Sequence, residues 1–209
     1  MPTDPVAMLA MRRLAAPLLL LLLLLAVAVV ASACKGGGAS SSSYDPTKRT
    51  EWLVDPKTAP IPDGYVSGVV DGSPVTVKKV EFFTETSGWN MRVAGTDAAS
   101  HDIVINVKIK EPIAAGKTYV ADRVTATGTQ LDVGDTATKK NHGESNLVSV
   151  YRVQIDRWDV KPYAGKFEVG AGIAAGRVYI GLQTTEGKQG GVAGTFLEAG
   201  VGYLNKPPW

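Results

Sequence analysis

Asp-Ile-Val-Ile-Asn-Val-Lys-Ile-Lys, residues 102–110, carries the clearest structural pattern in this chain of 209 residues. Its apolar side chains recur at every second position, at Ile103, Ile105, Val107 and Ile109, and most positions between them are polar. A period of two residues is that of a β-strand, whose successive side chains point to opposite faces. The segment is therefore predicted to be a strand with one buried face.

Three further segments show a similar alternation. They are residues 89–93, 151–155 and 178–182. On this pattern Trp89 and Tyr151 belong to buried strand faces. Within residues 74–83 the apolar register shifts, which predicts a β-bulge at Lys78-Lys79.

Short polar or glycine-rich breaks separate these segments and predict turns. They are Asp71-Gly72-Ser73-Pro74, Ser87-Gly88, Ala115-Gly116, Thr185-Glu186-Gly187-Lys188 and Gly190-Gly191. The stretch 182–196 is predicted to form a hairpin. No segment beyond the N-terminal region has a convincing helical period. The sequence therefore predicts a single all-β domain over residues 51–209, an antiparallel β-sandwich or jelly roll of about nine or ten strands.

The N-terminal region has a different character. Arg12-Arg13 precedes an apolar run over residues 14–30, and Ala31-Ser32-Ala33 then leads to Cys34, the one cysteine of the chain. A basic region, an apolar core and small residues before a cleavage point are the parts of a secretory signal peptide. Residues 1–33 are therefore predicted to be a signal peptide that is cleaved before the cysteine.

The order of these residues resembles the signal of bacterial lipoproteins, in which the cysteine after the cleavage site takes a diacylglyceryl group. The resemblance implies that Cys34 is lipidated and that residues 34–50, which open with a Gly/Ser-rich stretch, tether the domain to the membrane. Two or more acyl chains give stable anchoring. Lys35 stands where an Asp retains Gram-negative lipoproteins in the inner membrane, so the resemblance implies the outer membrane in such a cell.

Two other interpretations of the N-terminal region stay open. Ala31 departs from the Leu or Val that lipoprotein signals prefer at this position, and Ala31-Ser32-Ala33 is also an ordinary peptidase site, which would release a soluble secreted protein. The apolar run also approaches the roughly 20 residues that span a bilayer, so it could remain as an uncleaved anchor. All three interpretations place the domain outside the cytoplasm, in the cell envelope.

Four short segments of the domain invite comparison with a known group of proteins. They are Gly68–Gly72, Ala115–Tyr119, Arg177–Leu182 and Ala193–Phe196. They resemble segments of uncharacterised bacterial lipoproteins that carry a tethered β-sandwich domain. The resemblance implies a fold and a location. It implies no activity, because that group shares no catalytic motif.

The composition argues against several classes of function. Lys and Arg number 22 and Asp and Glu 20, so no basic field attracts nucleic acid, and no nucleic-acid partner is expected. No cysteine follows Cys34, so the domain folds without disulfides. Neither histidine, His101 or His142, accompanies a nucleophile motif. No catalytic residue is assigned, and an enzyme that hydrolyses envelope polysaccharide or peptide stays an alternative.

A calcium site is one binding hypothesis. Residues 131–146 are predicted to be a long irregular loop, and loops of that length are usually functional or disordered. The segment contains four residues with oxygen ligands, Asp132, Asp135, Asn141 and Glu144. Hard oxygen ligands suit calcium, although their spacing matches no EF-hand and Lys139-Lys140 would repel the ion. Calcium is the only cofactor that the sequence brings into consideration.

An aromatic binding face is the other hypothesis. Tyr and Trp carry an apolar ring with a polar edge, so exposed ones can stack on sugar rings. Trp158 is out of phase with Ile155 and is the better candidate for exposure, although it could also be a strand-end residue packed under a loop. Tyr163 follows shortly after it. The tail 206–209 is predicted to be extended, with Trp209 either packed on the sandwich or free. Together these patterns predict a membrane-anchored, non-enzymatic envelope protein that binds or scaffolds a glycan or a protein partner.

Overall fold

The computed structural model describes residues 44–123, 128–135, 140–145 and 147–209. The predicted signal peptide, its cleavage residues Ala31-Ser32-Ala33 and the predicted lipidation site Cys34 lie outside these residues. Within the described ranges, the chain contains no helix with the length and hydrophobicity needed to cross a membrane.

The described chain is built almost entirely of β-strands. In chain order the elements are η1 (Pro46–Lys48), β1 (Ser67–Val70), β2 (Ser73–Glu85), β3 (Gly88–Asp97), β4 (Asp102–Ile109), β5 (Thr118–Ala121), β6 (Gln130–Asp135), β7 (Lys140–Ser145), β8 (Val148–Val160), β9 (Glu168–Gln183) and β10 (Gln189–Tyr203). The predicted all-β, antiparallel fold is confirmed.

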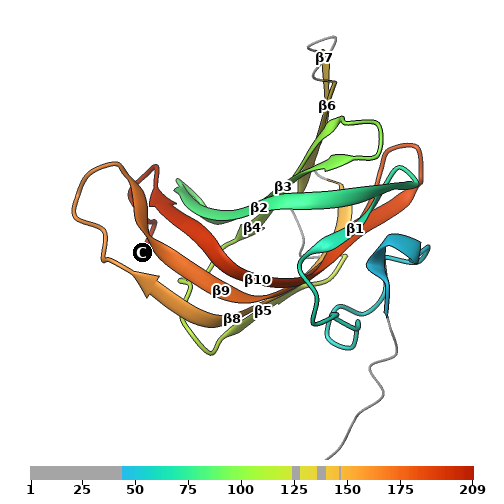
Figure 1. The fold of residues 1–209 in the computed structure, drawn as a ribbon. Helices are drawn as coiled ribbons and strands as arrows, with labels where there is room; N and C mark the ends of the chain where they lie inside the picture. The colour runs from blue at the N-terminus through green and yellow to red at the C-terminus, as the bar shows by residue number, and fades with distance from the viewer. Residues whose placement is uncertain (1–43, 124–127, 136–139, 146) are drawn as a thin grey trace, which may run out of the picture. The chain divides into compact units, whose positions relative to one another are not determined.

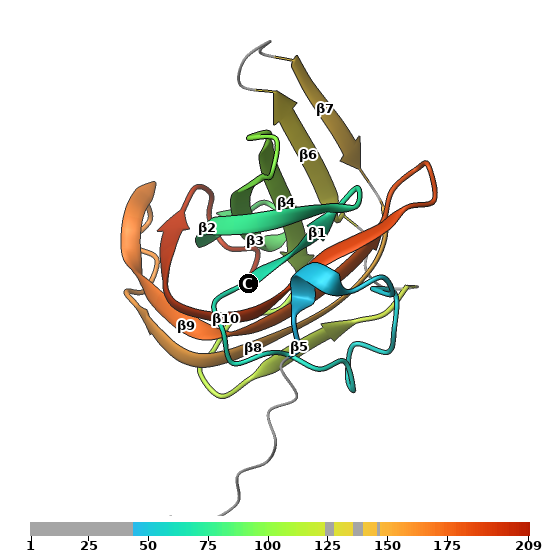
Figure 2. The ribbon, with the colours of Figure 1, turned by 45° about the vertical axis from the view of Figure 1, so that its right-hand side comes forward.

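All ten strands belong to one continuous sheet in the order β5-β8-β9-β10-β1-β2-β3-β4-β6-β7. Its neighbouring strands are antiparallel, and β10 also pairs in parallel with β2 because the short β1 separates them over only part of their length. The sheet bends strongly, so that β8, β9 and β10 curve beneath β2, β3 and β4 (Figures 1 and 2). The two halves of one sheet thus face each other like the layers of a sandwich.

The space between the two halves holds the inner core. The four apolar residues of the 102–110 strand have at most 2% of their surface exposed, as the alternation predicts. Met91, Val153 and Val178 reach the same core from the strands around them. Trp89 and Tyr151 are also buried in it, as predicted. Side chains at alternate positions of both halves therefore meet in one apolar layer.

Several local signals are confirmed by the backbone. The register between β2 and β3 shifts at Lys78, which is the predicted bulge. Asp71 and Gly72 both have positive φ, 50° and 78°, as the tight turns that favour Asp-Gly require. The hairpin over 182–196 forms from β9 and β10. The predicted turn at Gly190-Gly191 is wrong, because both residues lie inside β10.

The prediction of an irregular loop over residues 131–146 is also wrong. Most of that segment forms the antiparallel hairpin of β6 and β7, with Leu131 opposite Glu144 and Asp132 opposite Gly143. β7 is the last strand of the sheet, so the hairpin lies at an edge (Figure 2). Polar and charged residues are common in edge strands, where they discourage pairing with other chains. β7 contains no apolar residue, and the alternation of β6 is limited to Leu131 and Val133.

The outer face of β9 and β10 carries a second, smaller cluster, which we call the outer cluster. It consists of Trp52, Ala59, Val150, Tyr179 and Ala193. Trp52 is fully buried there, and the Tyr179 hydroxyl donates a hydrogen bond of 2.6 Å to its carbonyl oxygen. The Gln189 Oε1 atom accepts the Trp52 N–H at 2.8 Å. Side chains of the sheet thus make hydrogen bonds to the backbone N–H and C=O groups of Trp52, which lies in a segment that is not paired as a strand.

The folded region begins earlier than residue 51. Asp45 caps η1 by accepting the Thr47 N–H at 3.0 Å. The Arg49 guanidinium lies 5.3–5.5 Å from the ring centroids of Tyr44, Trp52 and Tyr179. Residues 44–50, which the sequence assigned to the tether, therefore pack on the sheet, because their aromatic and arginine side chains find apolar and aromatic partners there.

Two glycines make room for the outer cluster. Gly181 and Gly191 are cross-strand partners on β9 and β10. A Cβ atom on Gly191 would lie 2.4 Å from the Trp52 ring, and one on Gly181 would lie 2.0 Å from the Trp52 carbonyl oxygen. Gly191, which the sequence assigned to a turn, and Gly181 therefore form the surface on which Trp52 packs.

Candidate ligand-binding site

An aromatic pocket of about 360 Å³ lies where the start of β3 and the ends of β8 and β10 meet, near the C-terminus marked in Figure 1. We call it the aromatic pocket. Its lining residues are Trp89, Pro112, Ile113, Trp158, Tyr163, Tyr203, Lys206, Pro207 and Trp209. The two residues predicted to bind a ligand, Trp158 and Tyr163, are thus brought together in one site. Its size lies within the range of small-ligand pockets.

Trp158 lines this pocket in a way that the sequence phase did not predict. The pairing of β8 with β9 shifts register between Ile155 and Arg157, so a bulge changes the phase of the strand. Trp158 therefore points toward the inner core and is half-buried instead of exposed. Its ring packs edge-to-face on Phe82 and Trp89, with centroids 5.5 and 5.2 Å apart. Of the two interpretations of Trp158, the exposed platform is wrong, and the packed residue at the end of a strand is the one observed.

The remaining rings continue the same cluster. Tyr203, the last residue of β10, lies 5.5 Å from Trp89 and 5.4 Å from Tyr163 between ring centroids. Its hydroxyl donates to the Lys161 carbonyl at 2.8 Å, which holds the loop that carries Tyr163. Burial, and secondly the charge of Glu168, raise the pKa of Tyr203 above its ordinary value. The sequence does not mark Tyr203 as a site residue. Its one available signal is the alternation that it continues from Ala199 and Val201, which indicates a buried position.

The C-terminal tail closes one side of the pocket. The Thr84 hydroxyl donates to the Asn205 carbonyl at 2.6 Å, and the Asn205 N–H is 3.0 Å from the same hydroxyl oxygen. This pair of contacts fixes the tail just before it reaches the pocket. Trp209 has 48% of its surface exposed while it lines the site. Of the two predicted states of the tail, the structure places Trp209 against the sandwich with one part of its ring open to solvent.

The lining of the pocket is mainly aromatic, with one cation at its edge. Five of its residues are aromatic, and Lys206 is its one charged side chain among the described residues. Aromatic faces and edges can stack on a flat apolar surface of a ligand, and the lysine can donate hydrogen bonds to its oxygens. General acid–base work requires a titratable group in reach of the bond that breaks. Within the described lining, the titratable groups are Lys206 and the phenols of Tyr163 and Tyr203, and no Asp, Glu or His is among them.

Of the four residues predicted to bind calcium, the two whose side chains are described, Asp132 and Glu144, lie on opposite faces of the β6–β7 hairpin. Cross-strand partners share a face of a hairpin, so Glu144 lies on the face of Leu131, and Asp132 lies on the opposite face with Gly143. Glu144 instead accepts the Thr185 N–H at 2.8 Å. The side chains of Asp135 and Asn141 lie outside the described residues. Among those described, no group of three or more His, Cys, Asp and Glu residues is placed to hold a metal.

His101 takes part in the turn between β3 and β4. Its Nδ1 atom lies 2.9 Å from Asp97 Oδ2, and Asp97 also accepts the N–H groups of His101 and Ala99 at 2.8 and 2.9 Å. Burial opposes ionisation of Asp97, but these hydrogen bonds lower its pKa below the ordinary value. The side chain of His142 lies outside the described residues.

Comparisons with known proteins add no relative to this picture. No protein-family model, no curated protein and no solved structure matches the chain.

Proposed function

We propose that this chain is a cell-envelope lipoprotein, anchored through Cys34, whose β-sandwich binds an envelope glycan in the aromatic pocket. The observation that supports glycan binding is the pocket itself. Trp89, Trp158, Tyr163, Tyr203 and Trp209 converge from distant parts of the chain onto one partly open space. Rings that are packed edge-to-face against each other are already ordered, so a ligand that stacks on them costs little additional entropy.

The anchoring part of the proposal is supported by the order of residues around Cys34. A basic pair, an apolar run, small residues, one cysteine and a Gly/Ser-rich stretch follow one another. The described fold starts at Tyr44, so a Gly/Ser-type chain of residues 34–43 would have an r.m.s. reach of roughly 15–20 Å. Such a tether would keep the domain close to the envelope while allowing it to turn toward a glycan.

Two outer rings of the pocket provide the test of glycan binding. Trp209 is half exposed and Tyr163 is partly exposed, so Trp209→Ala and Tyr163→Ala should leave the fold intact. Each ring is expected to contribute about 0.5–1.5 kcal/mol by stacking, which corresponds to a roughly 2- to 10-fold loss of affinity. Binding is measured by co-sedimentation of the full chain with insoluble cell-wall glycan, followed by titration with soluble fragments.

Tyr65→Ala is the matched control, because Tyr65 is also about half exposed, at 49%, and does not line the pocket. An equal loss in this variant, or no loss in the pocket variants, contradicts the proposal. Release of new reducing ends from the glycan during the same assay would favour the alternative of a hydrolytic enzyme.

The anchor is tested separately. Cys34→Ala should abolish incorporation of labelled palmitate and release the protein from membranes, and mass spectrometry of the wild-type N-terminus should show a diacylated Cys34. Retention of the variant in membranes would favour an uncleaved anchor. An unmodified Cys34 at the N-terminus of a soluble protein would favour ordinary secretion after cleavage at Ala33.

A further inference from the structure

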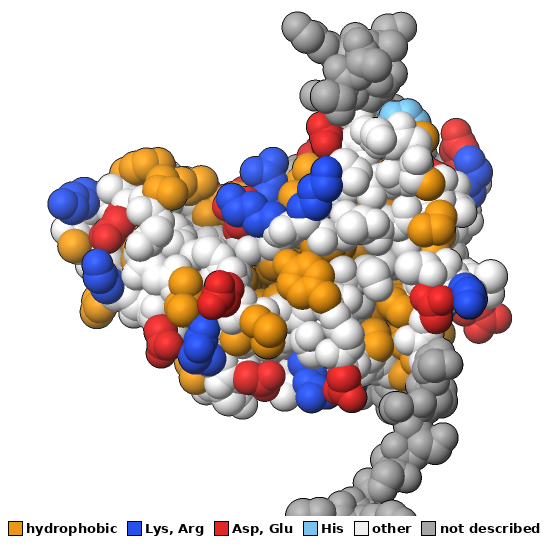
Figure 3. Space-filling model, in the orientation of Figure 1, with side chains coloured by type: hydrophobic (Ala, Val, Ile, Leu, Met, Phe, Trp, Pro, Cys, Tyr) orange, Lys and Arg blue, Asp and Glu red, His pale blue; other side chains and the backbone are white. Residues whose placement is uncertain are grey.

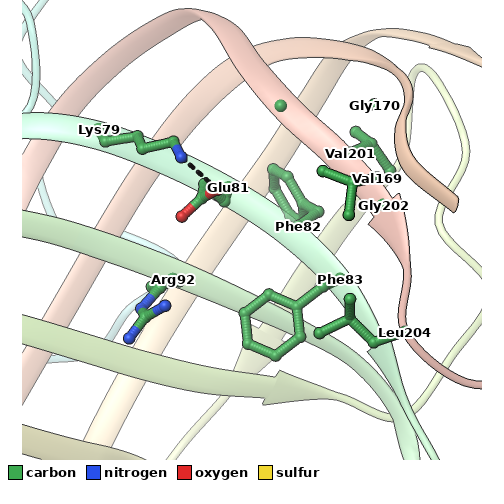
Figure 4. Close-up of a pocket in the computed structure, with 11 residues that line it drawn as sticks. Lys79, Glu81, Phe82, Phe83, Arg92, Val169, Gly170, Val201, Gly202 and Leu204 are labelled. Atoms are coloured by element: carbon green, nitrogen blue, oxygen red, sulfur yellow. Dashed lines mark ion pairs between the residues drawn. The ribbon is translucent and has the colours of Figure 1, made fainter.

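A second depression, also of about 360 Å³, lies on the outer surface where β2 and β10 run parallel. We call it the apolar groove, and it shares no lining residue with the aromatic pocket. Its lining is mostly apolar or glycine: Phe82, Phe83, Val169, Gly170, Gly200, Val201, Gly202 and Leu204. Figure 4 shows Phe83 and Leu204 side by side along it.

Strand alternation explains which of these residues face outward. Val201 is paired with Phe82 and both are buried in the inner core, with 2% and 1% of their surface exposed. The neighbours of Val201 on β10, Gly200 and Gly202, therefore point to the outside, and Gly202 lies beside Phe83. The groove thus lies on the outer face of the sheet, at positions where apolar residues replace the polar ones that usually face solvent.

Gly200 stands out because the fold does not require glycine there. Its φ lies outside the left-handed region, and a Cβ atom would meet no heavy atom within 4 Å. Glycine inside a strand is less stable than alanine, because it loses more backbone conformational entropy on folding. Neither packing nor backbone conformation requires glycine at position 200. The effect of the missing side chain is to leave the floor of the groove open.

Charged residues lie along one side of this floor. Lys79, Glu81 and Arg92 complete the lining, and the Lys79 Nζ atom pairs with Glu81 Oε1 at 2.6 Å, as the dashed line in Figure 4 shows. The two cations outnumber the single carboxylate, so the rim has a positive balance. Figure 3 shows Lys and Arg side chains gathered over β2 and β3, next to apolar side chains at the adjoining end of the sheet.

We propose that the apolar groove binds a single-chain amphiphile with an anionic head, such as an alkyl phosphate or a fatty acid. The alkyl chain lies over Gly200 and against Phe83 and Leu204, and the head group meets Arg92 and Lys79. Each buried methylene strengthens binding roughly fourfold, so the chain supplies most of the affinity. The positive rim supplies the preference for an anion.

The experiment uses the full chain in nanodiscs of zwitterionic lipid, so that it applies whichever form of the N-terminus exists. A photoreactive dodecyl phosphate is crosslinked to the protein, and the labelled peptides are mapped by mass spectrometry. Labels are expected at Phe83, Val169 and Leu204. Gly200→Leu fills the floor without a clash and should reduce this labelling about tenfold, with thermal stability unchanged or raised.

Gly64→Leu is the matched control, because a Cβ atom at Gly64 also meets nothing within 4 Å and the residue lies outside the groove. It should label like the wild type. Arg92→Gln changes an exposed side chain and should weaken labelling several-fold. Unlabelled dodecyl phosphate should compete, whereas dodecyltrimethylammonium and inorganic phosphate should not.

Three results would overturn the proposal. Undiminished labelling of Gly200→Leu at the three expected residues would remove the groove as the site. Equal competition by the cationic amphiphile would refute the anionic head. Equal competition by inorganic phosphate would show that the alkyl chain contributes nothing.

Discussion

The two faces of β9 and β10 are covered in different ways. Their inner face packs against the opposite half of the same sheet, through many aliphatic residues such as Ile105 and Val178. Their outer face is covered by an irregular segment that rests on a floor of Gly181 and Gly191 and is anchored by Trp52. The same two strands thus support a broad core that depends on many residues and a small cluster that depends on few.

This difference predicts that the two clusters lose structure separately. The inner core holds the strands together, so its loss unfolds the whole sheet. The outer cluster holds only the segment before β1, so its loss should open locally, as low-stability units of proteins do. The four predictions below test this separation, in order of decreasing effect.

Trp52→Ala should have the largest effect. Removal of a fully buried tryptophan costs about 3–5 kcal/mol. We expect the lost free energy to release residues 44–63 locally. Proteolysis should then cleave that segment rapidly, while the circular dichroism signal of the sheet persists. Trp209→Ala, which removes a half-exposed tryptophan, is the control. Loss of the whole sheet in a single transition would show instead that the two faces form one cooperative unit.

Ile105→Ala should lower the free energy of unfolding of the whole sheet by about 2–5 kcal/mol, because it leaves a cavity in the inner core. Chemical denaturation followed by circular dichroism measures the change. Val104→Ala is the matched control, because Val104 is the half-buried neighbour on the opposite face. Its cost should be less than half as large, and comparable costs would argue against the assigned inner face.

Gly191→Ala should destabilise the outer cluster by overpacking, at about 1–3 kcal/mol. The added Cβ atom would meet both the Trp52 ring and the Ile180 carbonyl oxygen, which is 2.1 Å away. Hydrogen exchange should show faster opening of the segment around Trp52 than in the wild type. If Gly200→Ala, in the same strand but with open space around it, opened this segment to the same degree, steric contact with Trp52 could not be the cause.

Alkaline pH should weaken both clusters, through Tyr179 in the outer cluster and, in the inner core, chiefly through Tyr151, whose pKa is shifted furthest. Burial raises the pKa of Tyr179 in the outer cluster and of Tyr151 in the inner core to about 12. Between pH 10 and 12 the unfolded chain ionises these phenols while the folded one does not. Stability that is complete below pH 10 is therefore lost as the pH rises toward 12, by on the order of 1–2 kcal/mol for each tyrosine.

The corresponding variants separate the two contributions. Tyr179→Phe should flatten the pH dependence of segment release, measured by proteolysis, and Tyr151→Phe should flatten that of global unfolding, measured by urea denaturation. An identical change of both profiles in both variants would argue that the faces titrate and open together.

Most of the inner core follows from local sequence patterns. The alternation in residues 102–110 identifies its strand and its buried face, and Asp71-Gly72 identifies a turn that the backbone confirms. The sequence shows such signals because a strand that is buried on one face must alternate apolar and polar side chains. The β6–β7 hairpin is not recognised in the sequence because β6 offers only the short alternation of Leu131 and Val133, and the edge strand β7 contains no apolar residue.

The candidate site was only partly predictable. Trp158 and Tyr163 stand out as aromatic residues outside the plain core pattern, and both line the pocket. The orientation of Trp158 could not be predicted, because a single bulge after Ile155 reverses the face of every residue beyond it. Tyr203 and Trp209 enter the pocket from the end of the chain, and no local pattern connects them with Trp89.

The amino-acid order is sufficient for the properties that depend on neighbours along the chain: strand periods, tight turns, the bulge at Lys78 and the expected signal before Cys34. The properties that depend on residues far apart come from the folded chain. Trp52 packs on Gly181 and Gly191 only in the folded chain. The five aromatic rings line one pocket only when the sheet bends and its ends meet. The physical reason is that alternation specifies which face of a strand is apolar, whereas what covers that face is chosen by packing across long sequence separations.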